Sequence, residues 1–116
     1  MADPIYHLAL AADWDSSASE YRGSTLGRSL EDEGFVHCSA VWQVQGIADA
    51  VYWGHDDVVL LTIDPDRLGA DVRIEDGYPH IYGPIPTDAV ASARAVPLDG
   101  DGRLLLDGLL PDSPAG

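Results

Sequence analysis

The 116-residue sequence has no lysine and only one cysteine. A single cysteine excludes an intramolecular disulfide. Six arginines stand against 20 aspartate and glutamate residues, so the formal net charge at pH 7 is −14. A surface of this charge repels phosphate backbones, and we therefore expect no nucleic-acid partner.

Long hydrophobic runs are absent as well. No apolar segment approaches the roughly 20 residues that cross a bilayer, and the residues after Met1 lack the basic start and apolar stretch of a signal peptide. We expect a soluble, cytoplasmic protein without a membrane partner. The length predicts a single domain over residues 1–116, with a core over about 5–98 and a flexible tail over 111–116.

The hydrophobic pattern predicts an α+β fold. Five segments alternate or are apolar over strand-like lengths: 5–11, 35–39, 57–64, 71–76 and 91–98. The 57–64 segment is apolar at consecutive positions, which is typical of a central strand. We expect a bent or split, mainly antiparallel sheet of about five to seven strands, with two or three helices.

Helical patterning is limited to two segments. Apolar residues at three- and four-residue spacing predict a helix over 40–54, capped by Ser39. A shorter helix over 26–33 should end at Gly34. The segment 77–90 holds three prolines and two glycines, so we expect neither a long helix nor a central strand there.

Three of the four histidines lie in or beside predicted strands: His7, His37 and His80. If these strands are neighbours, the imidazoles line one cleft. Imidazole titrates near neutral pH and therefore suits acid–base catalysis, hydrogen bonding to a ligand, or metal binding. The alternative for each histidine taken alone is a structural role in the core.

The spacing of the metal-binding residue types argues against a metal site. Neighbouring residues of a strand point to opposite faces, so His37 and Cys38 should not reach one ion or form a Cys/His nucleophile. The sequence also lacks an HxxxH or CxxC pair. We expect no metal, with Cys38 packed in the core and His37 sharing a face with Ser39.

Further polar residues flank the predicted cleft. Arg22 and Ser24 lie in the polar loop between the first two histidines and are candidates for contacting a phosphate. For Arg22 the alternative is a surface ion pair with the abundant acids. Glu75 is a candidate general base or acceptor for a ribose hydroxyl, or else the solvated end of a strand. Tyr82 is a candidate ligand-binding residue of the proline-rich segment.

Four blocks of sequence carry a family resemblance: "IYHLALAADW", "LEDEGFVHCS", "VVLLTID" and "YPHIYGPIP". In this order, over residues 5 to about 98, they resemble the DUF952 family, small bacterial proteins of unknown function. More remotely, the layout is similar to the ADP-ribosyltransferase superfamily, whose sites combine residues of three core strands around NAD. The resemblance implies an ADP-ribosyltransferase-like fold, a small-molecule ligand, and NAD as a substrate.

The resemblance also implies roles for individual residues. His7 would contact the ribose next to nicotinamide, and His37 and Ser39 would border the nicotinamide pocket. The third strand usually brings a glutamate, where this chain has His80, with Glu75 five residues earlier. The implied catalytic residues are His37 and His80, and the implied NAD-binding residues are His7, Ser39, Arg22, Ser24, Tyr82 and Glu75.

The missing glutamate leaves two other functions open. Imidazole does not supply the fixed negative charge that stabilises an oxocarbenium ion. A noncatalytic module that binds a small ligand or a protein on the same scaffold is therefore the main alternative. A hydrolase that acts on another small metabolite through a histidine base is also open.

Overall fold

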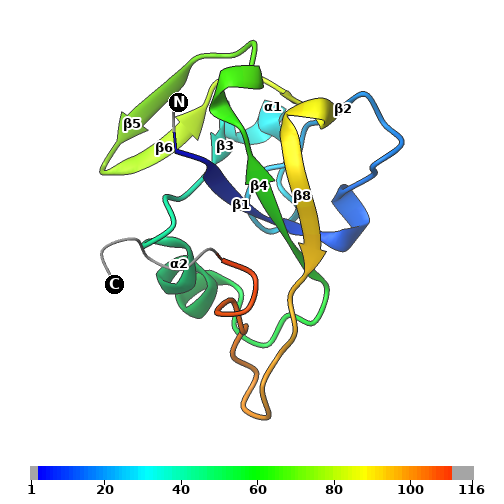
Figure 1. Cartoon of the computed structure of the whole chain (residues 1–116), viewed down its shortest axis with the longest axis vertical. Helices are drawn as coiled ribbons and strands as arrows, with labels where there is room; N and C mark the ends of the chain where they lie inside the picture. Colours follow the sequence, from blue (N-terminus) through cyan, green and yellow to red (C-terminus); the bar gives the residue numbers. More distant parts are fainter. Residues whose placement is uncertain (1–2, 111–116) are drawn as a thin grey trace.

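The computed structural model describes residues 3–110, within which one sheet has three antiparallel strands in the order β1-β4-β8 (Figure 1). The strands are β1 (Ile5–Leu10), β4 (Val58–Ile63) and β8 (Val90–Ala95). β4 lies in the middle of this sheet, as its apolar sequence predicts, and both of its faces are buried. Leu60 packs in one hydrophobic cluster and Leu61 in another.

A second sheet of the described residues has the order β3-β6-β5. It consists of β3 (Val36–His37), β5 (Val72–Glu75) and β6 (Tyr78–Ile81). Asp76 and Gly77 join β5 to β6 with φ angles of 54° and 84°. Two consecutive positive φ angles are the pattern of a type I′ hairpin turn, for which Asp-Gly is a favoured sequence.

The expectation that the proline-rich segment avoids a central strand was wrong, because β6 is the middle strand of this sheet. Pro79 lies within β6 and has no N–H to donate. Its carbonyl accepts a hydrogen bond from the Cys38 amide at 3.0 Å, so it still contributes to the pairing. β3 is only two residues long, and one lost donor therefore interrupts little of the ladder.

The remaining elements are short. A two-stranded sheet pairs β2 (Glu20–Tyr21) with β7 (Ile85–Pro86). The α-helices found within residues 3–110 are α1 (Leu30–Glu33) and α2 (Val44–Val51). Single turns of 3-10 helix complete the elements: η1 (Ala11–Asp13), η2 (Thr25–Gly27), η3 (Pro65–Arg67) and η4 (Thr87–Ala89). The fold is thus α+β with split, mainly antiparallel sheets, as expected.

Both helices are shorter than predicted. α1 begins after Ser29, whose hydroxyl accepts from the Asp32 amide, and it ends at Gly34 with φ 84°, as expected. α2 does not begin at Ser39, so the predicted cap was wrong. The Ser39 backbone instead pairs with Tyr6 of β1, and the chain enters α2 only at Gln43.

Two hydrophobic clusters fill the space on either side of β4. The cluster under α2 combines residues of β1 and β4 with Leu104 and Leu106, which are both fully buried. Packing therefore continues past residue 98, the boundary expected from the sequence, because the apolar run near the C-terminus folds back against α2. The expected tail, 111–116, lies outside the described residues.

The longest helix among residues 3–110 has eight residues. A bilayer-spanning helix needs roughly 20 apolar residues. None of the described helices meets that requirement.

The buried and exposed leucines of the C-terminal run give a direct test of the packing. Leu104→Ala is expected to lower the free energy of unfolding by about 2–5 kcal/mol, because it opens a cavity under α2. Leu105→Ala, at a side chain with 40% exposure, should change it by about 0.5 kcal/mol or less. Urea unfolding measures both, and equal losses for the two variants would contradict the described packing.

Candidate functional site

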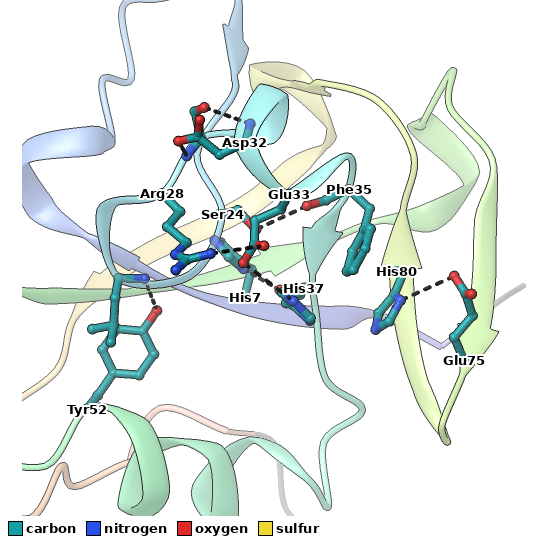
Figure 2. A network of polar contacts seen from close by, with 12 residues as sticks. His7, Ser24, Arg28, Asp32, Glu33, Phe35, His37, Tyr52, Glu75 and His80 are labelled. Carbon is teal, nitrogen blue, oxygen red and sulfur yellow. Dashed lines mark hydrogen bonds and ion pairs between the residues drawn. The ribbon is translucent and has the colours of Figure 1, made fainter.

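A cleft of about 430 Å³ opens between β1, β3, β6 and α2. The structure brings the three strand histidines, His7, His37 and His80, to this one cleft, where Figure 2 shows them on neighbouring strands. Each comes from a different predicted strand or segment. Their proximity follows from the pairing of β3 with β6, which places His37 opposite His80, and from the bridge between Tyr6 and Ser39.

His7 is buried and uses both ring nitrogens within the protein. Nδ1 lies 2.5 Å from the backbone carbonyl oxygen of His37, and Nε2 lies 2.8 Å from the hydroxyl oxygen of Tyr21. A carbonyl oxygen only accepts, so Nδ1 carries the proton and donates. Nε2 of the neutral ring then accepts from the Tyr21 hydroxyl.

The surroundings keep His7 neutral. Burial lowers the pKa of His7 from 6.5 to about 4, against the opposing effect of its bond to the His37 carbonyl. Burial also raises the pKa of the Tyr21 hydroxyl, which therefore stays a donor. The family resemblance implied that His7 contacts a ribose. In the structure both of its ring nitrogens instead form hydrogen bonds that connect β1, β2 and β3.

His37 and His80 form an aromatic group with Phe35, the only phenylalanine in the sequence. The His37 and His80 rings are 4.9 Å apart between centroids, edge to face. The Phe35 ring stacks on His80 with centroids 4.3 Å apart and meets His37 edge to face. Desolvation, together with the nearby His80, lowers the pKa of His37, so its ring is predominantly neutral at pH 7.

A carboxylate accompanies each of these two histidines (Figure 2). Glu33 Oε1 lies 3.8 Å from His37 Nε2, and Glu75 Oε1 lies 3.3 Å from His80 Nδ1. Glu33 was not among the site residues predicted from the sequence. The available signal was its position four residues before His37, although Gly34 ends the helix between them and makes that spacing weak.

The two residues expected to contact a phosphate are not part of the cleft lining. Arg22 lies on the surface, where its guanidinium pairs with Glu20 and Glu31 at 2.5 Å each, so the alternative of a surface ion pair was the correct interpretation. Ser24 is buried, and its hydroxyl donates to the Phe35 carbonyl at 3.0 Å. Ser24 therefore fixes the backbone next to the cleft.

The other predicted residues lie closer to the cleft. Ser39 lines it, and two backbone hydrogen bonds with Tyr6 hold its position. Glu75 also lines it, and the Tyr82 hydroxyl donates to the Glu75 carboxylate from outside. Cys38 is buried among apolar residues, and burial raises the pKa of its thiol, which disfavours a thiolate nucleophile.

The cleft is acidic. Its charged lining consists of the carboxyl groups of Glu33, Glu75 and Asp76, and no arginine of residues 3–110 lines it. Coordination of a metal is not supported either, since the described residues contain no group of three or more ligands arranged around one point. The arrangement is suited to proton transfer and to holding a neutral or cationic ligand.

These features were compared with known families and structures. The family model described as "Protein of unknown function (DUF952)" matches residues 9–93. The chain belongs to the DUF952 family. The resemblance inferred from the four sequence blocks is thereby confirmed at the family level.

Solved structures of one bacterial protein share the fold. The crystal structure of protein CC0527 from Caulobacter crescentus has a TM-score of 0.76 at 30% identity and covers 89% of this chain and 94% of that chain. The solution NMR structure of CC0527 gives 0.75 at 32% identity, with 92% and 96% covered. No curated protein matches the chain.

The neutral state of His7 predicts a pH dependence of stability. The pKa of about 4 in the folded state lies below the ordinary 6.5, so the unfolded chain takes up the proton first as the pH falls. The free energy of unfolding should therefore fall by roughly 3 kcal/mol between about pH 6.5 and pH 4 from this group alone. Urea unfolding at pH 7 and pH 4.5 measures the effect.

Two variants isolate the contribution of His7. His7→Gln, which keeps a donor and an acceptor, should lose this part of the pH dependence, whatever its stability at pH 7. The matched control, His55→Gln, alters a partly exposed imidazole beside Asp57 and should retain this pH dependence. A His7→Gln variant with the wild-type pH dependence would show that His7 is not the responsible group.

Proposed function

We propose that this DUF952 protein binds the nicotinamide-riboside part of NAD, or a related N-glycoside, in the histidine cleft and promotes cleavage of the glycosidic bond. This is ADP-ribosyltransferase-like chemistry. The observation that carries the proposal is the pairing of two of the three cleft histidines with carboxylates, His37 with Glu33 and His80 with Glu75.

The two histidine–carboxylate pairs supply the negative charge that is missing at the third motif position. Cleavage of an N-glycoside passes through a transition state with oxocarbenium character, which a fixed negative charge stabilises. The third motif position has His80 in place of glutamate, but the β5–β6 hairpin returns Glu75 to the side of that histidine. Glu33 gives the cleft a second carboxylate at the His37 end.

The charge of the cleft indicates which part of the ligand enters it. Nicotinamide riboside is a cation, and the lining of carboxylates attracts a cation while repelling a diphosphate. No guanidinium is among the described lining residues: Arg22 is held in surface ion pairs, and Arg28 pairs with Glu33 at 3.5 Å from outside the lining. The diphosphate and adenosine parts of NAD would therefore lie outside the cleft.

The cleft residues take distinct roles in this proposal. The C–N glycosidic bond breaks and nicotinamide leaves as a neutral molecule, while the sugar carbon bonds to an oxygen of water or of an acceptor hydroxyl. His37 and His80 are the catalytic groups that take the proton of that oxygen, and Glu33 and Glu75 stabilise the positive charge that develops on the sugar. Ser39, held in place by its backbone, offers its hydroxyl to the ligand. His7 is a positioning residue, because its N–H fixes the carbonyl of His37 rather than touching the ligand.

A noncatalytic small-ligand module is the second candidate function. The observation favouring it is that the Glu75 carboxylate already accepts from the Tyr82 hydroxyl and lies against His80. A carboxylate engaged in this way stabilises a bound cation without acting on it. Such a module would bind the same ligand and leave the glycosidic bond intact.

Calorimetry with NAD and with nicotinamide riboside tests the proposal, followed by chromatography for released nicotinamide. We expect nicotinamide riboside to bind at least as tightly as NAD, because it lacks the diphosphate. Glu75→Gln should reduce nicotinamide release by at least about 100-fold. The matched control is Arg22→Gln, which removes a surface ion pair and should leave both binding and release unchanged.

The outcomes separate the two candidates. Nicotinamide release that depends on Glu75 supports the enzyme, and saturable binding without release supports the noncatalytic module. No binding of either compound at millimolar concentration would overturn both. Loss of binding on Arg22→Gln would overturn the placement of the ligand in the histidine cleft.

A further inference from the structure

The strand β5 forms an exposed edge of its sheet. It pairs only with β6, and all four of its residues are exposed. Ile74, at its centre, has 68% of its surface accessible, and Val72 is also exposed. Figure 1 shows β5 at the periphery of the molecule, with β6 between it and the remaining strands. Exposed edge strands with apolar residues are surfaces on which another strand can pair.

The pairing with β6 determines which backbone groups of β5 are free. The Tyr82 amide donates to the Asp71 carbonyl across the two strands at 2.9 Å. In an antiparallel pair the residues directed at the partner alternate, so Arg73 and Glu75 also bond to β6. The amide and carbonyl of Val72 and Ile74 consequently point away from β6 and toward solvent.

We propose that β5 pairs with β5 of a second copy of the chain, antiparallel and with the two-fold axis at Ile74. In this register the outward amide and carbonyl of each Ile74 exchange both hydrogen bonds with the partner's Ile74. The two isoleucine side chains lie side by side across the axis and shield each other from water. The proposal does not depend on the proposed function of the cleft.

Charge complementarity disfavours an axis at Arg73, and exposure favours Ile74 over Val72. An axis at Val72 would also set opposite charges together, Arg73 against the partner's Asp71, but it would cover the 38% exposed Val72 in place of the 68% exposed Ile74. With the axis at Ile74, Arg73 lies opposite the partner's Glu75, and the symmetry repeats the pair on the other side of the axis. With the axis at Arg73, two guanidinium groups would oppose each other, and Asp71 would oppose the partner's Glu75. Opposite charges directly across two strands stabilise the pairing, and like charges destabilise it.

The outer strands of the β1-β4-β8 sheet lack these features: β1 is mostly buried and bridges to Ser39, and β8 is irregular. The pairing of β8 with β4 shifts register between Thr62 and Ile63, and such irregularities make an edge a poorer template. β8 carries Arg94 but no acidic residue within its bounds. Self-pairing of β8 therefore offers no charge complementarity, and β5 is the edge that suits a second copy.

The pairing would also alter the cleft. Glu75 lines the cleft beside His80, so the partner's Arg73 would stand next to a cleft carboxylate. A guanidinium at that point would reduce the negative charge at the cleft entrance. The interface itself is small, because only short strands meet, and complexes below about 1,200 Å² are weak and transient.

Sedimentation velocity over a range from micromolar to millimolar protein tests the proposal. The buffer should contain at least 0.15 M salt, where the Debye length of about 8 Å screens the repulsion between two acidic chains. The wild type should show concentration-dependent dimerisation. Arg73→Glu and Glu75→Arg, tested singly, should each weaken it by at least about tenfold, because both charge pairs become repulsive.

Mixing the two charge-reversed variants tests the register itself. In a one-to-one mixture the reversed charges complement each other on both sides of the axis, so a heterodimer at least as stable as the wild-type dimer should form. Trp42→Lys is the control, because it alters an exposed aromatic residue that is not part of β5. All three substituted residues are exposed, and amide NMR spectra verify that the variants fold.

Several results would overturn the pairing. These are a wild type that is monomeric at every concentration, single variants that dimerise as well as the wild type, or a mixture that does not associate. Loss of association on Trp42→Lys would place the interface elsewhere. A strand supplied by a different protein would appear as a monomeric wild type in these measurements, and it too would contradict pairing with a second copy.

Discussion

The hydrogen bonds of His7 are the interactions on which the site depends. This one side chain, on β1, donates to the carbonyl of His37 on β3 and accepts from Tyr21 on β2. It thereby connects one strand of each of the three sheets at a buried point. Because an unpaired buried nitrogen costs free energy, the neutral ring with its proton on Nδ1 is the state that this packing requires.

The neutral His7 has consequences for the residues around it. Its donated bond orients the backbone at His37, and the pairing of β3 with β6 then sets His37 against His80. The imidazoles of His37 and His80 lie beside carboxylates from α1 and β5, so the cleft brings negative charge and proton-carrying groups together. These groups restrict the charge of the ligand, since they favour a cation or a neutral molecule over a phosphate.

Several local features were predictable and others were not. The strand around Leu60 and the stop at Gly34 follow from apolar runs and backbone preferences. The β5–β6 hairpin was not predicted, although Asp76-Gly77 is a favoured sequence for such a turn. The prolines that follow argued against a strand and obscured this signal. A surface ion pair was one of the two roles considered for Arg22, but its partners Glu20 and Glu31 were not predictable, because the fold of the loop brings them together.

The amino-acid sequence by itself determined the α+β class, the family, and the acidic character of the surface, because these depend on composition, periodicity and ordered motifs. Tertiary structure alone decided which polar residues share the cleft. Glu33 and Glu75 reach their histidines through strand pairing and a tight turn, and Arg22 and Ser24 turn away from it. Contacts between residues distant in the chain arise from sheet register, which no local pattern specifies.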